Sequence, residues 1–206
     1  MSTKPILFNT EMVRAILDGR KSCTRRICKD ANECTVPDMD YYDPDKRTYA
    51  VHNYADKKHT DKLSIAERTC PICPDDILYV RETWCKGLER YIYRADYSDT
   101  EKFYQDGKEI NMKWHPSIHM PKEAARIWLK VTDVRVERLQ EITETQAQSE
   151  GCNSGLLTGA CTARGQFEDL WNSTIKKSDL ARYGWNANPW VWVIEFERCE
   201  RGGIDG

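Results

Sequence analysis

Lys21 and Thr24 are the residues whose types and spacing point most directly to chemistry. They lie in the polar run Gly-Arg-Lys-Ser-Cys-Thr-Arg-Arg. A threonine hydroxyl is a poor nucleophile at neutral pH and needs a base beside it. Lysine can be that base if desolvation or nearby positive charge lowers its pKa, and Arg20, Arg25 and Arg26 supply such charge. On this spacing alone, however, a run of charges more often indicates a solvated loop.

Cys70 and Cys73 form a Cys-x-x-Cys pair that could supply half of a zinc site. The remaining ligands would have to come from Cys28, Cys34, His52 or His59. A zinc ribbon shows a second close pair, and the other cysteine spacings here are irregular. His115 and His119 are four residues apart, but Pro116 disfavours a helical metal-binding face between them. We therefore expect neither a metal nor another cofactor.

Two of the seven tryptophans are candidates for stacking on a nucleobase. These are Trp84 and Trp114, which lie next to polar loops. Trp128, Trp190 and Trp192 fall in predicted strands, where tryptophans more often belong to the core or its rim.

The elements that must position these residues begin with a short helix. We expect Thr10 to cap it, residues 13–17 to supply its apolar stripe, and Gly19 to end it. Later, Thr143 and Gln146 form a capping box, and the helix that it opens runs to Glu150. A further short helix is predicted around residues 167–171.

Strand patterns occupy four other segments. Residues 76–84 and 190–196 are rich in β-branched and aromatic residues. Residues 127–131 and 134–139 are predicted to be two paired strands, and the second alternates apolar and charged residues. Crossover helices do not alternate regularly with strands, which disfavours a doubly wound parallel sheet.

We predict a single α+β domain over residues 1–206, formed by a small β-barrel with peripheral helices. Residues 29–68, 86–124 and 152–184 are predicted to be long insertions in loops on its surface. Residues 29–68 in particular carry no steady hydrophobic period.

The composition excludes some classes of protein. Thirty-one basic and 33 acidic residues give a net charge of −2, unlike proteins whose affinity comes mainly from phosphate contacts. No apolar run approaches the roughly 20 residues of a membrane helix. The apolar block at residues 5–8 is too short for a signal peptide. We expect a cytoplasmic protein with no membrane contact.

The run Gly-Arg-Lys-x-x-Thr-x-Arg, after a short N-terminal helix, resembles the signature of the ASCH family, which is built on the PUA-like β-barrel. Residues 76–80 resemble its second-strand block, 129–134 its central strand pair and 193–196 its final strand. The longer architecture, with Val-Arg-Glu-Thr-Trp at 80–84, is more similar to ASCH proteins common in phages and prophages. The resemblance covers somewhat under half of the chain.

Within that family the chain is most similar to small bacterial enzymes that hydrolyse N4-acetylcytidine to cytidine and acetate. Their catalytic lysine and threonine correspond to Lys21 and Thr24, and their catalytic glutamate to Glu150. The resemblance implies an amidohydrolase acting on a modified pyrimidine nucleoside or base. Neutral Lys21 would take the proton of Thr24, whose oxygen attacks the acyl carbon. Glu150 would position the exocyclic nitrogen or deliver a proton to it.

Arg26, and also Arg81 and Glu82, could hold the base or the oxyanion. For Arg81 and Glu82 the plainer alternative is an ion-paired strand surface. Two other functions stay open: an RNA-binding PUA-like module in which Lys21 and Arg25 contact phosphate, and a ribonuclease that uses the same Lys–Thr pair. The expected partners are the modified pyrimidine nucleoside or base and, by weak binding, RNA.

Overall fold

The computed structural model describes residues 2–29, 37–43, 48–54, 62–69, 71–87, 90–105, 107–153 and 162–201. Contacts between residues divide the chain into two compact units. Unit 1 comprises Met1–Ser22, Asp75–Lys130 and Phe196–Gly206, and unit 2 comprises Cys23–Pro74 and Val131–Glu195. The single domain over residues 1–206 stays a prediction.

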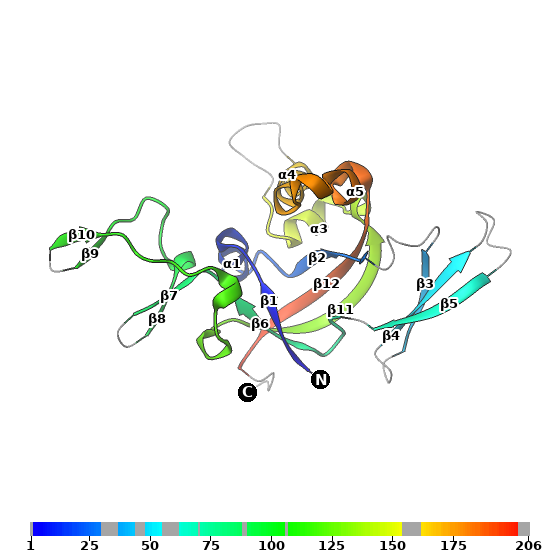
Figure 1. Ribbon diagram of the computed structural model, residues 1–206, viewed down its shortest axis with the longest axis horizontal. Helices are drawn as coiled ribbons and strands as arrows, with labels where there is room; N and C mark the ends of the chain where they lie inside the picture. The colour runs from blue at the N-terminus through cyan, green and yellow to red at the C-terminus, as the bar shows by residue number, and fades with distance from the viewer. Residues whose placement is uncertain are drawn as a thin grey trace. The chain divides into compact units, whose positions relative to one another are not determined.

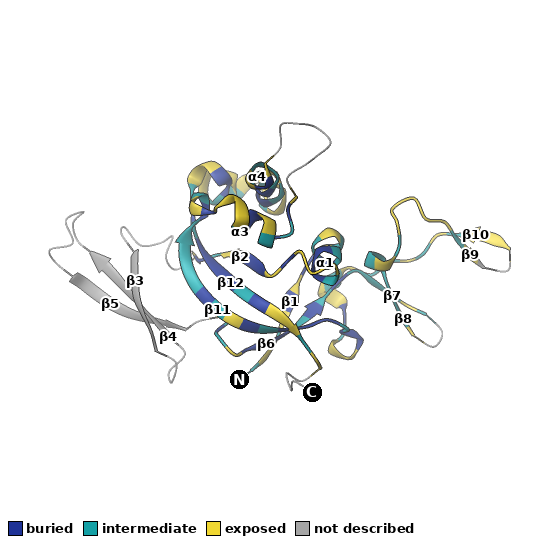
Figure 2. Ribbon diagram, turned by 180° about the vertical axis from the view of Figure 1, so that it is seen from behind, coloured by how far each residue is buried: buried dark blue, intermediate teal, exposed yellow. Residues whose placement is uncertain are grey.

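Five strands form a mixed sheet in the order β1-β6-β11-β12-β2. They are β1 (Thr3–Leu7), β6 (Ile77–Arg81), β11 (Trp128–Arg138), β12 (Trp190–Cys199) and β2 (Cys23–Ile27) (Figure 1). In unit 1, β1 pairs parallel with β6, and β11 pairs antiparallel with β6. In unit 2, β12 pairs antiparallel with β2. Residues 191–194 of β12 are buried, as expected for a strand with a neighbour on each side (Figure 2).

Unit 1 also contains helix α1 (Thr10–Leu17). The side chain of Asn9 caps it by accepting a hydrogen bond from the backbone N–H of Met12 at 2.8 Å. The prediction that Thr10 is the cap is therefore wrong by one residue, because asparagine is as effective a cap as threonine. Gly19 has φ +74°, a conformation that favours glycine, and the helix ends before it as predicted.

The rest of unit 1 is built from short pieces. Two antiparallel hairpins join β7 (Trp84–Lys86) to β8 (Tyr91–Tyr93) and β9 (Phe103–Gln105) to β10 (Lys108–Ile110). Three 3₁₀ helices, η1 (Arg94–Asp96), η2 (Ser117–His119) and η3 (Lys122–Ala124), lie in the same region. A buried cluster of Ile77, Met120, Ala124, Ala125 and Trp128 forms its core.

In unit 2, helices α3 (Glu144–Ser149) and α4 (Ala163–Thr174) lie over β2 and β12 (Figure 1). The capping box that the sequence predicts opens α3, since the Thr143 side chain accepts from the Gln146 amide and the Gln146 side chain accepts from the Thr143 amide. Every fourth residue of helix α4 is buried, at Ala163, Phe167 and Trp171. The apolar cluster that these helices share also contains Leu139, Ile142, Ala147, Cys152, Trp185, Val191 and Val193. Short helices η4 (Leu139–Glu141), η5 (Lys177–Asp179), α5 (Leu180–Tyr183) and η6 (Trp185–Ala187) complete the unit.

A second sheet in unit 2 corrects the prediction that residues 29–68 are an insertion without regular structure. Strands β3 (Pro37–Asp43), β4 (Thr48–Tyr54) and β5 (Lys62–Thr69) pair antiparallel in that order. β4 reads Thr-Tyr-Ala-Val-His-Asn-Tyr, and β-branched and aromatic residues favour strands. The polar composition of the segment hid this preference.

The α+β class is confirmed, with two corrections to its strands. Residues 128–138 form one continuous strand, β11, because the polar residues at its middle do not interrupt its extended backbone. β1 and β2 were not predicted, since each has only five residues and β2 contains two arginines. The closing strand at 190–196 is confirmed as β12.

Candidate functional site

Six polar or charged residues are buried among those that the structure describes: Lys21, Thr24, Arg25, Asp76, Glu82 and Glu150. Charged side chains are rarely buried unless they are paired, and strongly buried titratable groups gather at functional sites. Asp76 is accounted for by its ion pair with Lys4 at 2.9 Å and its hydrogen bond from the Ser2 hydroxyl at 2.7 Å. The three residues for which the sequence resemblance implies catalysis all belong to this set of six.

Thr24 lies in β2, where it pairs with Ile194 of β12 and is 2% exposed. Side chains alternate between the faces of a strand, so Cys23 and Arg25 share the opposite face. The Arg25 guanidinium lies 4.0 Å from the Cys23 sulfur, and Cys23 lies 3.9 Å from the carbonyl of Gln146 in α3. β2 therefore directs Arg25 toward the helices of unit 2.

Glu150 is the C-cap residue of α3, and its position follows from the capping box that starts the helix. Its backbone N–H donates to the carbonyl of Gln146 at 3.0 Å, which closes the last turn. Its side chain is buried, and Oε1 accepts a hydrogen bond from Nη1 of Arg25 at 3.2 Å. The sequence predicts the helix end at Glu150 but gives no sign of this partner.

Arg25 also reaches a second carboxylate. Its Nη2 donates to Oε2 of Glu137, on β11, at 3.3 Å. Oε1 of Glu137 accepts from Arg135, which also donates to Asp133 at 2.8 Å and to Glu195 at 2.6 Å. Desolvation lowers the pKa of Arg135, but its hydrogen bonds with these three carboxylates outweigh that effect and raise the pKa above its ordinary value. A chain of ion pairs thus connects Glu150 through Arg25 to β11 and β12.

The Arg25 side chain has no exposed surface. A phosphate group could not contact it without a rearrangement of unit 2.

Lys21 belongs to unit 1 and follows α1. Its backbone N–H and that of Arg20 both donate to the carbonyl of Ala15. These hydrogen bonds and the turn at Gly19 fix the position of the Lys21 backbone against the end of α1. Lys21 is 3% exposed, and its Nζ lies 5.5 Å from the ring centroid of Phe8. Burial beside an aromatic ring gives the Lys21 side chain a partly apolar environment.

The three residues predicted to bind substrate differ from one another. Arg26 retains exposed surface, yet desolvation by the protein lowers the pKa of its guanidinium while the charge of Glu150 opposes this shift. The guanidinium carbon of Arg81 lies 5.9 Å from the ring centroid of Tyr79. Its buried Nε has no hydrogen-bond partner among the described residues.

Glu82 forms an ion pair, which is the plainer of the two roles predicted for it. Both of its oxygens accept hydrogen bonds from Arg126, at 2.9 and 3.0 Å. Burial raises the pKa of Glu82, and the hydrogen bond and charge of Arg126 counteract that shift. Desolvation lowers the pKa of Arg126, but Glu82 and Asp96 outweigh it and raise the pKa. The bidentate geometry decides between these opposing effects in favour of a charged pair.

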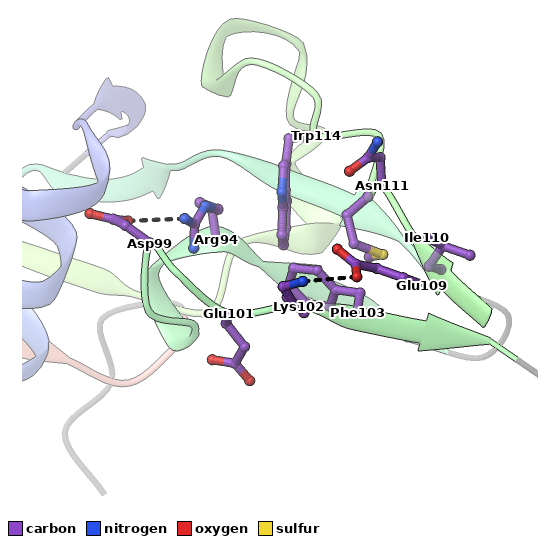
Figure 3. A pocket seen from close by; sticks show the side chains of 10 residues that line it. Arg94, Asp99, Glu101, Lys102, Phe103, Glu109, Ile110, Asn111 and Trp114 are labelled. Carbon is purple, nitrogen blue, oxygen red and sulfur yellow. Dashed lines mark hydrogen bonds and ion pairs between the residues drawn. The ribbon is translucent and has the colours of Figure 1, made fainter. Parts of the chain in front are cut away.

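A pocket of ≈ 320 Å³ in unit 1 is lined by Trp114, one of the two predicted stacking residues (Figure 3). Trp114 lies 5.9 Å from the ring of Phe103, and the Arg94 guanidinium lies 5.7 Å from its centroid. The charges around the pocket pair with each other, Arg94 with Asp99 at 2.9 Å and Lys102 with Glu109 at 3.0 Å (Figure 3). Trp84, in contrast, packs against Tyr91 and His115. Trp128 and Trp192 are buried, in agreement with their prediction as core residues.

Within the described part of the chain, no group of three or more His, Cys, Asp or Glu side chains could hold a metal ion. Cys73 is buried, while Cys70, the other cysteine of the Cys-x-x-Cys pair, lies outside the described residues. Within the same part of the chain, the helices are too short or too polar to cross a bilayer.

No family model and no curated protein matches this sequence. The structure is similar to a crystal structure of an ASCH domain from Lactobacillus crispatus JV V101, with 12% sequence identity and a TM-score of 0.42. The similarity covers 96% of this chain and 79% of that one. At this identity the likeness concerns the fold alone.

Proposed function

We propose that this protein is an amidohydrolase that removes an acyl group from the exocyclic N4 of a cytidine-type nucleoside. Lys21, Thr24 and Glu150 carry the reaction. The observation that supports this most is their burial at 3%, 2% and 3% exposure, among only six buried polar or charged residues in the described part of the chain. Burial of charged groups is unfavourable, so a fold that buries these groups points to a use for them.

In the proposed reaction Lys21 is the base that takes the proton of the Thr24 hydroxyl. The Thr24 oxygen then attacks the acyl carbon, and the bond from that carbon to N4 breaks as N4 receives the proton that Lys21 took from Thr24. Water hydrolyses the resulting threonine ester, which releases the carboxylic acid and restores the hydroxyl. Lys21 and Thr24 are separated by two residues, so covalent geometry keeps their Cα atoms within about 11 Å of each other.

Glu150 positions the N4 amide. An ionised carboxylate accepts hydrogen bonds and cannot donate them, and its pairing with Arg25 is that of an ionised group. The single N–H of an N4-acylcytidine is a matching donor. Arg26, an exposed residue of β2, is the proposed contact for the base or for the oxyanion.

The proposal is tested by incubating the purified protein with a series of N4-acylcytidines and following the loss of their ultraviolet absorption. We expect turnover by the wild type and a loss of at least about 100-fold for both Thr24→Ala and Lys21→Ala. The double variant should be little worse than either one, because residues that act as a unit are not additive. Thr24→Ser should retain part of the activity, since it keeps a hydroxyl.

The two rival functions give different results with RNA. Cleavage of labelled single-stranded RNA, lost in Thr24→Ala, would indicate the ribonuclease. Binding of RNA with a steep dependence on salt, together with no turnover of any acylcytidine, would indicate the binding module and overturn the proposal.

A further inference from the structure

We propose that Arg25 is a positioning residue that holds the Glu150 carboxylate in place, with Glu137 as the fixed anchor on its other side. The inference rests on the function proposed for Glu150. Arg25 touches neither the reacting carbon nor N4 in this scheme; it acts through Glu150.

The geometry of Arg25 suits this role. Nη1 donates to Glu150 at 3.2 Å and Nη2 donates to Glu137 at 3.3 Å, so one guanidinium joins α3 to β11 through two different nitrogens. A guanidinium is planar and rigid, which fixes the angle between its two acceptors. A lysine in the same place would have one ammonium nitrogen on a flexible stem and could not set that angle.

The anchor is itself held. Oε2 of Glu137 accepts from Arg25 and its Oε1 accepts from Arg135, so both carboxylate oxygens are engaged. Arg135 is bonded in turn to Asp133 and Glu195. Glu150 stands at the end of α3, a helix of only six residues. Arg25 therefore transmits the rigidity of the strands to the end of a short helix.

Arg25 is a poor choice if its role were only to stabilise the fold. Its side chain has no exposed surface, its Nε has no hydrogen-bond partner in the described part of the chain, and its guanidinium carbon lies 5.9 Å from the Phe167 ring centroid. An apolar side chain would suit a position at the edge of the apolar cluster of unit 2, and replacing a buried ion pair by apolar groups is often neutral or stabilising. A charged residue with an unused donor is explained better by the carboxylate that it holds.

The experiment compares Arg25→Met and Arg25→Lys with Arg135→Met, measuring kcat and KM for an N4-acylcytidine. Arg135→Met is a graded comparison, because it removes a support of Glu137 and leaves the contact from Arg25 to Glu150 in place. A displaced catalytic group commonly loses about 100-fold in rate, so we expect Arg25→Met to lose roughly that factor in kcat with KM changed less than threefold. Arg25→Lys should recover part of the loss, and Arg135→Met should lose less kcat than Arg25→Met, since Arg25 still reaches Glu150. A folded Arg25→Met protein with wild-type kcat would overturn the inference.

A second measurement does not depend on activity. Thermal unfolding of Arg25→Met, Glu150→Gln and the double variant tests whether the two residues are coupled. Because each single variant leaves its partner without a matching charge, the drop in Tm of the double variant should be smaller than the sum of the single drops. Additive drops with turnover intact would overturn the role of Arg25 alone. Coupled drops without any turnover in the wild type would overturn the proposed function, and with it the catalytic meaning of the Arg25 contact.

Discussion

Each unit of this protein contains a buried glutamate that pairs with an arginine, and the two pairs differ in kind. In unit 1, Arg126 donates to both oxygens of Glu82 at 2.9 and 3.0 Å, and its guanidinium carbon lies 4.0 Å from the Tyr93 ring centroid. In unit 2, Arg25 divides its nitrogens between Glu150 and Glu137 at 3.2 and 3.3 Å. Arg126 thus donates two hydrogen bonds to one carboxylate, whereas Arg25 donates one hydrogen bond to each of two carboxylates.

Burial alone would not separate these pairs, since Glu82 and Glu150 are both almost fully buried. Hydrogen-bond satisfaction does separate them. In a bidentate pair, both carboxylate oxygens of the glutamate accept hydrogen bonds from the same arginine. Such a pair, with its arginine stacked on an aromatic ring, is typical of a structural contact. The guanidinium of Arg25 instead divides its nitrogens between two carboxylates, and its Nε has no hydrogen-bond partner in the described part of the chain. We therefore expect the unit 1 pair to contribute mainly to stability, and the unit 2 pair to contribute to the proposed reaction.

The largest expected effect is that of Glu150→Gln on turnover. Glutamine keeps the size of the side chain and an oxygen for Arg25, but removes the negative charge that accepts the N4 hydrogen bond. We expect kcat for an N4-acylcytidine to fall by at least about 100-fold. Glu195→Gln is the matched control, because Glu195 belongs to the same ion-pair chain through Arg135 and has no part in the proposed reaction. Equal losses in the two variants would mean that the whole chain, and not Glu150, matters for the rate.

The next effect is on stability and belongs to unit 1. Arg126→Met leaves Glu82 buried without its partner, so we expect the free energy of unfolding at neutral pH to fall by about 2–3 kcal/mol. Chemical denaturation of the variant and the wild type measures this difference. The kcat of the folded variant should stay close to wild type, in contrast to the variants of Arg25.

The pH dependence of that loss sharpens the prediction. Burial raises the folded-state pKa of Glu82 above its ordinary 4.5, and Arg126 works against the shift. Without Arg126 the folded variant holds a proton that the unfolded chain releases, over the range from about pH 4.5 up to the raised pKa. A carboxyl group with a raised pKa destabilises the fold above that pKa, and this contribution disappears as the pH falls. The gap between variant and wild type should therefore be largest at neutral pH and narrow toward pH 4.5. A gap independent of pH would show that lost packing, not the charge of Glu82, is the cause.

The sequence predicts the local parts of both pairs and none of their partners. Thr143 and Gln146 place Glu150 at the end of α3, because a capping box is a signal contained within four residues. The partners of Arg25 are 112 and 125 positions away in the chain. Arg25 and its two glutamate partners are brought together only by the pairing of β2 with β12 and by the packing of α3. The spacing of apolar residues along the sequence predicts neither of these contacts. β2 was itself missed, because two arginines in five residues conceal a strand.

The smallest expected effect comes from removing the N-cap of a helix. It compares α3, which carries a residue of the proposed site, with α4, which does not. Thr143 and Thr162 both cap helices of unit 2, and their side chains accept from the amides of Gln146 at 3.2 Å and Gly165 at 3.1 Å. Replacing either threonine by alanine should cost about 1 kcal/mol of stability, since each change removes one N-cap hydrogen bond.

Only Thr143→Ala should also lower kcat, by a few-fold. Helix α3 has six residues, so fraying at its first turn is transmitted within two turns to Glu150 at its end. Helix α4 has 12 residues and carries no residue of the proposed reaction, although the amides of Ala163 and Arg164 at its start donate to Glu144 in the first turn of α3. Measuring Tm and kcat for both variants tests the difference, because stability should fall equally while turnover falls in one. If Thr162→Ala lost as much kcat as Thr143→Ala, the rate would follow the stability of unit 2 as a whole. The distinction between a stabilising and a functional ion pair would then have to rest on Arg25 alone.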